Sequence, residues 1–250
     1  MAAWIARGAW VLVAIVGGAA IDGALADRSD AVRWVAGVGC WMLWGIVMAA
    51  LALPAVRSLT IARVGAPLSL VVAVVAAVAG APALDLALLA VPAVVACAAI
   101  FTADFGRVFV QASSYGDEER LPLRFPVAAG SAAVVMWVIW APALLLGPIL
   151  IAAKNPIGGG ILTLLAAAGI VLLVPKWHRL SRRWLVLVPA GLVVHDPVVL
   201  ADTLMVRTNQ LAGMRLAPAD TEAADLTGPA SGFAIEVQAS ETVTTVFAFT

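Results

Sequence analysis

Apolar residues fill the first 175 positions in six long runs, and the 75 positions after them hold short runs rich in Val and Leu. A bilayer core of about 30 Å needs about 20 mostly apolar residues per helix, so each long run predicts a transmembrane helix. Short apolar runs bounded by turn residues predict β-strands. The predicted fold class is therefore a membrane α-helical bundle of six transmembrane helices (residues 1–175), followed by a small antiparallel β domain (residues 176–250).

Proline and glycine punctuate the predicted spans. Pro92, Pro142 and Pro148 lie inside spans and should kink them. The link Gly80-Ala81-Pro82-Ala83 is so short that the third and fourth spans should form an antiparallel hairpin. The third and sixth spans are near the lower length limit for crossing a bilayer. The six spans are Ile5–Ala26, Val32–Leu53, Val64–Gly80, Leu84–Thr102, Val127–Ala153 and Gly158–Val174.

The composition agrees with a membrane protein. The chain is 63% apolar and 12% charged, whereas a soluble domain is about half apolar and about a quarter charged. The formal net charge is zero, which gives no attraction to nucleic acid, so no nucleic-acid partner is predicted. Cys40 and Cys97 both fall in apolar runs and are predicted to be buried and unbridged.

Loop charge predicts the orientation, because Lys and Arg are enriched in cytoplasmic loops. With the N-terminus inside, ten basic residues lie on the cytoplasmic side and three on the outer side. We therefore expect a multi-pass protein of the cytoplasmic (inner) membrane with both termini in the cytoplasm. Cleavage of a signal peptide after Ala26, which would leave five spans, is the alternative. The cytoplasmic set is Arg7, Arg57, Arg63, Arg107, Arg120, Arg124, Lys176, Arg179, Arg182 and Arg183, and the outer set is Arg28, Arg33 and Lys154.

Few ionisable residues enter the predicted spans. Asp22, Asp85 and Asp104 are the only carboxylates in or against a span, and each lies close to a span end. No Lys, Arg or His occupies a span centre. A proton-coupled transporter or ion pump needs charged groups along its path, so this distribution counts against that class.

The chain also has nine tryptophans, which is an unusually high number. Trp41 with Trp44, and Trp137 with Trp140, form two pairs spaced three residues apart near mid-membrane. Packing between helices is the predicted role of both pairs, with a quinone or lipid site as the alternative. The tryptophans predicted to lie in interfacial belts are Trp4, Trp34, Trp177 and Trp184.

The longest connection, Thr102–Pro126, is predicted to be cytoplasmic. Its first half predicts a continuation of the fourth helix, with Phe105, Val108 and Phe109 on one face. The acidic run Asp117–Glu119 predicts a solvated turn. Adjacent residues on a helix point in different directions and no His lies nearby, so a metal site is not predicted.

The chain after Val174 changes character. The basic collar Lys176–Arg183 serves the orientation rule and attracts anionic headgroups. The runs WLVLVP and LVVHD around Ala190-Gly191 predict a hairpin, and Asp202–Arg207 and Gly213–Leu216 predict further strands. A polar loop follows over residues 217–232. The runs FAIEVQ and TVTTVFAF predict a second hairpin.

These C-terminal runs resemble bacterial pleckstrin-homology-like domains attached to membrane helices. The resemblance rests on Arg183-Trp184, Gly191-Leu192-Val193 and Met205-Val206-Arg207, and it covers about the last 70 residues. It implies a bent β-sheet that serves as an assembly or regulatory module without enzymatic activity. Such domains close with a C-terminal helix, whereas this sequence reaches Thr250 on a predicted strand, so truncation at that point is an open alternative. The whole chain also resembles an uncharacterised actinobacterial integral membrane protein family.

No motif predicts a catalytic, cofactor or metal site. His195-Asp196 reads as a turn, Ser181 lacks the G-x-S-x-G elbow of hydrolases, and Gly158-Gly159-Gly160 lacks the context of a phosphate loop. The acidic turn, the collar and nearby aromatic residues are instead predicted to dock the loop on the β domain. These candidate interaction residues are Asp117, Glu118, Glu119, Arg179, Arg182, Arg183, Trp184, Phe105 and Phe109.

We therefore expect a non-enzymatic accessory, assembly or regulatory subunit of the cytoplasmic membrane. Its expected partners are the lipid bilayer and either another membrane protein or further copies of itself. A transporter or channel subunit is one alternative. A membrane enzyme of lipid or cell-envelope metabolism is the second.

Overall fold

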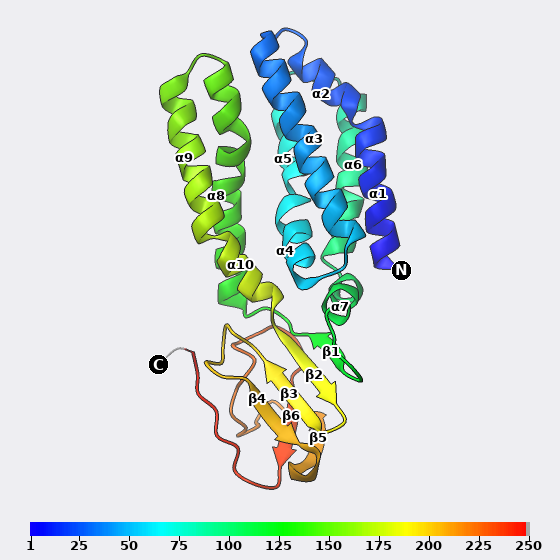
Figure 1. Cartoon of the computed structure of the whole chain (residues 1–250), viewed down its shortest axis with the longest axis vertical. Coiled ribbons are helices and arrows are strands. Elements are labelled where there is room, and N and C mark those ends of the chain that lie inside the picture. Colours follow the sequence, from blue (N-terminus) through cyan, green and yellow to red (C-terminus); the bar gives the residue numbers. More distant parts are fainter. Residues whose placement is uncertain (249–250) are drawn as a thin grey trace.

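The computed structural model describes residues 1–248 and has six helical segments that are long and apolar enough to cross a membrane, followed by small antiparallel sheets (Figure 1). The predicted fold class is thereby confirmed, and the chain is a multi-pass membrane protein. Large apolar side chains such as Leu164 and Val171 are exposed on the helices, as lipid contact requires. The six segments are Ala2–Leu25, Asp30–Ala52, Val56–Val78, Ala83–Ile100, Val127–Ala152 and Pro156–Ser181.

The first of these segments is divided at Gly17 into α1 (Ala2–Val16) and α2 (Gly18–Leu25). A Cβ atom at Gly17 would lie 2.5 Å from the carbonyl oxygen of Val13 and 2.7 Å from Leu89 Cδ1. Only glycine therefore allows the close approach of the fourth segment at this point.

Two further segments are divided next to a proline, whose missing N–H weakens the helical ladder. The third consists of α4 (Val56–Gly65) and α5 (Leu68–Val78), with Pro67 between them. The sixth consists of α9 (Pro156–Leu172) and α10 (Val174–Ser181). Both segments extend beyond the predicted spans because α4 and α10 are helical despite their basic residues.

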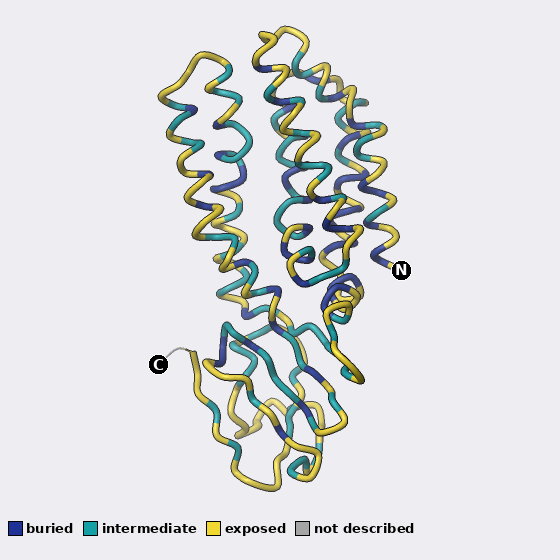
Figure 2. Tube along the Cα trace, in the orientation of Figure 1, coloured by how far each residue is buried: buried dark blue, intermediate teal, exposed yellow. Residues whose placement is uncertain are grey.

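The remaining segments are single helices: α3 (Asp30–Ala52), α6 (Ala83–Ile100) and α8 (Val127–Ala152). The α8–α9 hairpin lies beside the bundle of α1–α6, and the N-terminus lies at the end of that bundle that faces the sheets (Figure 1). Buried positions gather at that end of the bundle (Figure 2). Its main apolar cluster includes Trp10, Leu51, Leu59, Ile100 and Phe105.

The helix predicted at the start of the 102–126 connection forms, but as a separate element. The hydroxyl of Thr102 accepts a hydrogen bond from the N–H of Phe105 at 3.2 Å and caps α7 (Ala103–Gln111). Phe105, Phe109 and Val110 are buried in the main cluster. The apolar face of this amphipathic helix therefore packs against the bundle.

The second half of this connection supplies a strand that the sequence did not predict. Strand β1 (Glu119–Pro122) pairs with β2 (Trp184–Val188), followed by β3 (Gly191–His195) and β4 (Leu204–Arg207), in one antiparallel sheet of order β1-β2-β3-β4. The prediction of a solvated turn over the whole of Asp117–Glu119 is therefore wrong at Glu119, which is the first residue of β1.

The predicted hairpin β2–β3 is confirmed. Gly191 has φ +152°, and a Cβ there would lie 2.2 Å from the carbonyl oxygen of Val206 on β4, so the turn requires glycine. The register places Leu185 and Leu187 of β2 on the same sheet face as Leu192 and Val194 of β3, and of these four residues only Leu192 is buried.

The predicted second hairpin is wrong. Strand β6 (Ile235–Ala239) pairs with β5 (Leu211–Leu216), which follows the 3₁₀ turn η1 (Thr208–Gln210). The segment 246–248 instead lies along residues 199–201, through hydrogen bonds from Ala201 N to Val246 O and from Ala248 N to Val199 O, both 2.9 Å. Position 249 of the predicted last strand is outside the described residues. Between residues 184 and 248 the described chain contains no α-helix.

Candidate functional site

The residues predicted to dock the loop on the sheet lie at the junction between the helices and β1–β4. Phe105 and Phe109 stack with ring centroids 4.3 Å apart and are fully buried. Trp184, at the start of β2, packs against the same apolar cluster. The structure therefore brings the three predicted aromatic residues to one cluster that joins α7 to the sheet.

The acidic side chains do not lie on the collar arginines. Glu118 forms an ion pair with Arg120 at 2.6 Å, and Glu119 pairs with Arg107. The hydrogen bond from the N–H of Tyr115, together with Arg120, lowers the pKa of Glu118. Asp117 is exposed. The loop is held on the sheet by main-chain pairing of β1 with β2 instead of by the predicted charge attraction.

The three collar arginines have different surroundings. Arg179 donates to the carbonyl oxygen of Pro197 at 2.5 Å, and an Arg182 nitrogen lies 3.5 Å from Nε2 of His195. Arg183 is buried. Its position therefore differs from that of a solvated collar residue.

Arg183 forms a buried ion pair in the β module, by which we mean the β1–β4 sheet together with the β5–β6 ribbon. Its Nε and Nη2 donate to the two carboxylate oxygens of Asp196 at 2.8 and 2.6 Å. It also donates to the carbonyl oxygens of Arg124 and Thr227. Asp196 accepts from the N–H groups of Val198 and Val199 as well. The pair thus joins β2, the turn after β3, the segment before α8 and the loop before β6.

This pairing leaves no catalytic arrangement at His195-Asp196. Nδ1 of His195 is 3.2 Å from the hydroxyl oxygen of Thr203, and the ring stacks on Trp184 with centroids 4.9 Å apart. Burial and the positive charge of Arg182 lower the pKa of His195. The carboxylate of Asp196 is engaged by Arg183, so it does not orient the imidazole as a catalytic base would require.

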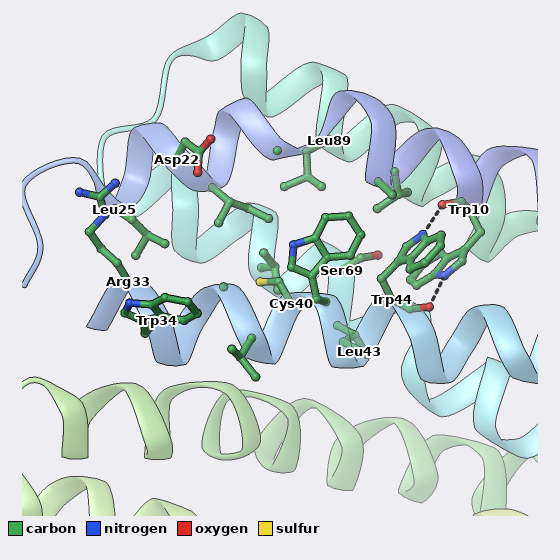
Figure 3. A pocket seen from close by; sticks show the side chains of 18 of the residues that line it. Trp10, Asp22, Leu25, Arg33, Trp34, Cys40, Leu43, Trp44, Ser69 and Leu89 are labelled. Atoms are coloured by element: carbon green, nitrogen blue, oxygen red, sulfur yellow. Dashed lines mark hydrogen bonds between the residues drawn. The ribbon is translucent and has the colours of Figure 1, made fainter. Parts of the chain in front are cut away.

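A second candidate site is a pocket of about 710 Å³ inside the helical bundle. Helices α1 and α2 form one wall and α3 the opposite wall, while α5 and α6 contribute Ser69, Val72 and Leu89. Figure 3 shows Asp22 and Arg33 at one end of the pocket and the Trp10–Trp44 pair at the other, with Cys40 between them.

The inner end of the pocket is closed by a reciprocal contact between α1 and α3. The indole Nε1 of Trp10 donates to the carbonyl oxygen of Trp44 at 3.0 Å, and the indole Nε1 of Trp44 donates to the carbonyl oxygen of Trp10 at 2.9 Å (Figure 3). Trp41 stands edge-on to Trp44, with ring centroids 5.7 Å apart.

The opposite end of the pocket carries charge. Asp22, Asp30 and Arg33 line it, and among residues 1–248 none of the three has an ion-pair partner. The pocket is open at its side, because Trp34 is 73% exposed and Trp41 63% exposed. A flexible amphiphilic molecule can therefore enter from the surroundings of the bundle.

The predicted tryptophan pairs divide between packing and the pocket. Trp137 donates to the carbonyl oxygen of Val64 at 2.9 Å, and Trp140 donates to that of Ala166 at 3.0 Å, so both join helices. Trp177, predicted at an interfacial belt, is instead buried edge-on against Trp140. Trp41 makes no such hydrogen bond with any residue of the described part of the chain, and it lines the pocket. The spacing of Trp34, Val38 and Trp41 on one helical face is the sequence signal that points to the pocket wall.

Within residues 1–248, no three His, Cys, Asp or Glu side chains gather as a metal site would require. The pocket presents apolar, aromatic and charged side chains, which can recognise an amphiphilic molecule. Comparisons of the chain with protein-family models, with curated proteins and with solved structures give no match.

Proposed function

We propose that the chain is a non-enzymatic accessory subunit of the cytoplasmic membrane that binds a membrane-protein partner through its β module. In this proposal both termini and the sheets lie in the cytoplasm. Support for the orientation comes from the basic residues of α4, α7, β1 and α10, which outnumber the three basic residues of the outer loops.

The observation that carries the proposal is that two separate parts of the chain form one sheet. Strand β1 comes from the connection between α6 and α8, whereas β2–β4 follow α10. The chain therefore passes between the bundle and the sheet before β1, after β1 and before β2. A module tied at three points has a fixed position relative to the membrane, as a subunit that positions a partner requires.

The surface proposed for the partner is one face of the β5–β6 ribbon. Leu216 pairs with Ile235 and Met214 with Val237, so these side chains share a face. Leu216 is 67% exposed and Ile235 55% exposed, and the adjacent Phe233 is 90% exposed. The other face carries the Arg215–Glu236 ion pair.

An apolar ribbon face outside the bilayer has no lipid to cover it. Exposed apolar patches on soluble surfaces mark protein interaction sites. The proposed occupant is a cytoplasmic apolar segment of a membrane protein.

Site-specific photocrosslinking in the native membrane tests this proposal. A photoreactive residue at Ile235 should give one discrete adduct with a membrane protein, while the same residue at Gln238, on the opposite face of β6, should give little. An adduct of twice the chain's own mass would identify the occupant as a second copy. Equal yields at the two positions, or no adduct at Ile235, would contradict the proposal.

A further inference from the structure

We propose that the tryptophan-lined pocket binds a zwitterionic membrane lipid with a primary ammonium headgroup, of the phosphatidylethanolamine class. Its headgroup would lie between Arg33 and the carboxylates of Asp22 and Asp30, and one acyl chain would extend toward the Trp10–Trp44 pair. This inference goes beyond the proposed function, because it needs no protein partner.

The shape of the pocket fits an amphiphile. Its charged end lies next to the turn between α2 and α3, where the helices end, and its apolar body continues along α3 to Trp44 (Figure 3). A lipid in the surrounding leaflet has the same order, with its head at the surface and its chain inward. The open side at Trp34 and Trp41 lets a chain enter laterally from the bilayer.

The aromatic lining suits a hydrocarbon chain better than a soluble ligand. The body of the pocket is bounded by Trp10, Trp41 and Trp44, with apolar side chains such as Leu43 and Leu89. Ligand pockets of about 300–1,000 Å³ are typically lined in this way, with a few polar groups that fix orientation. Here the polar groups are confined to one end.

Charge at that end selects the headgroup. One guanidinium and two carboxylates face the pocket without ion-pair partners among the described residues. A lipid phosphate pairs with Arg33, since guanidinium binds phosphate strongly. A primary ammonium has three N–H donors for Asp22 and Asp30. An anionic lipid satisfies Arg33 but is repelled by the two carboxylates, and a choline headgroup has no N–H donor.

Quenching of tryptophan fluorescence measures this selectivity on the full-length protein. Nanodiscs of phosphatidylcholine would contain, as a minor component, phosphatidylethanolamine or phosphatidylglycerol with the same brominated acyl chains. Bulk lipid quenches equally in the two preparations, so a difference reports the specific site. We expect clearly stronger quenching by the brominated phosphatidylethanolamine, and the difference should be smaller in Trp41→Phe, which removes one of the four tryptophans that line the pocket. Trp4→Phe is the control, because Trp4 is 73% exposed but does not line the pocket.

Charge variants test the headgroup contacts. Arg33→Gln and Asp22→Asn should each weaken the ethanolamine-specific quenching about tenfold in apparent affinity, as the loss of one charged hydrogen bond predicts. Arg28→Gln and Asp27→Asn are matched controls on the adjacent turn outside the pocket lining and should retain it. Since Asp22 and Arg33 are exposed and unpaired, their replacement leaves the packing of the bundle intact.

A chemical probe provides a second readout. In a Cys97→Ala background Cys40 is the single cysteine, and it lines the pocket. N-ethylmaleimide should modify Cys40 more slowly in nanodiscs that contain phosphatidylethanolamine than in those that contain phosphatidylglycerol. Equal quenching and equal modification in both lipids, or a preference that persists in Arg33→Gln and Asp22→Asn, would overturn the proposal.

Discussion

Arg183 and Asp196 form a bidentate ion pair in which both side chains are buried, with N–O distances of 2.8 and 2.6 Å. Four charge-assisted contacts surround the pair. Arg183 donates to the carbonyl oxygens of Arg124 and Thr227, and Asp196 accepts from the N–H groups of Val198 and Val199. A buried ion pair satisfied in this way fixes the arrangement of the segments that it joins.

Removal of one partner should destabilise the β module. In Asp196→Ala the guanidinium of Arg183 stays buried without its counterion, at a cost of about 3–5 kcal/mol in the free energy of unfolding. The double variant Arg183→Met/Asp196→Leu should recover much of this loss. Hydrogen exchange of the β2 and β3 amides, followed with increasing denaturant in detergent, measures both. In contrast, Arg215→Ala removes a guanidinium that is 58% exposed, and Thr221 still donates to Glu236, so stability should change by less than about 1 kcal/mol. An equal loss in both single variants would contradict the structural role.

Loss of one of the two hydrogen bonds between Trp10 and Trp44 should destabilise the protein less than loss of the buried ion pair. Trp44→Phe removes one indole donor and should destabilise the contact between α1 and α3 by about 1 kcal/mol. Thermal unfolding in nanodiscs measures the change. Trp4→Phe is the control, because Trp4 is 73% exposed, lies outside the pocket lining and donates no side-chain hydrogen bond in the described structure. A larger loss in the control than in Trp44→Phe would count against the reciprocal contact.

The helical part of the fold was predictable because its signal is local. Each apolar run is long enough to form a span by itself, so the six spans, the tail of strands and the β2–β3 hairpin followed from the sequence. The breaks next to Pro67 and Pro175 have a local cause, the missing N–H of proline. Gly17 gave no comparable signal, because its break depends on the approach of Leu89 from a distant helix.

The connections between distant segments could not be predicted in the same way. Strand β1 is four residues long and contains Glu119, Arg120 and Pro122, so its local pattern indicates a polar turn. It becomes a strand only because its backbone forms hydrogen bonds with the backbone of β2. The ion pair of Arg183 could not be predicted for a similar reason. A basic residue after a span is already explained by the orientation rule, so its position in the sequence does not indicate a buried carboxylate partner. The pocket combines residues from five helices, which no local pattern reveals.

The pairing of β1 with β2 can be tested by disulfide formation. Leu121 lies directly opposite Leu185 in the register, where Cβ atoms are about 4.5–5.5 Å apart, close to disulfide geometry. In a background without Cys40 and Cys97, Leu121→Cys/Leu185→Cys should oxidise readily, as detected by mass spectrometry of linked peptides. The offset pair Leu121→Cys/Leu187→Cys should oxidise much more slowly. Equal rates would mean that β1 is not held in this register.

The low pKa of His195 predicts how stability depends on pH. Burial and Arg182 lower it below the ordinary 6.5, so the unfolded chain takes up the proton first as the pH falls. This contribution to stability is present above the unfolded pKa and is lost progressively below about pH 6.5. His195→Gln should therefore flatten the decline in unfolding midpoint between about pH 7 and 5.5. An unchanged slope in the variant would show that the decline comes from other groups.

Co-purification from native membranes in mild detergent tests the proposed function most directly. The wild-type chain should retain a membrane-protein partner in stoichiometric amount. Ile235→Asp, which places a charge on the apolar face of the β5–β6 ribbon, should lose that partner while the bundle stays folded. Gln238→Asp adds the same charge on the opposite face of the same strand and should keep it. Recovery of the wild-type chain without a stoichiometric partner, or retention of the partner by Ile235→Asp, would contradict the role of this face in an accessory subunit.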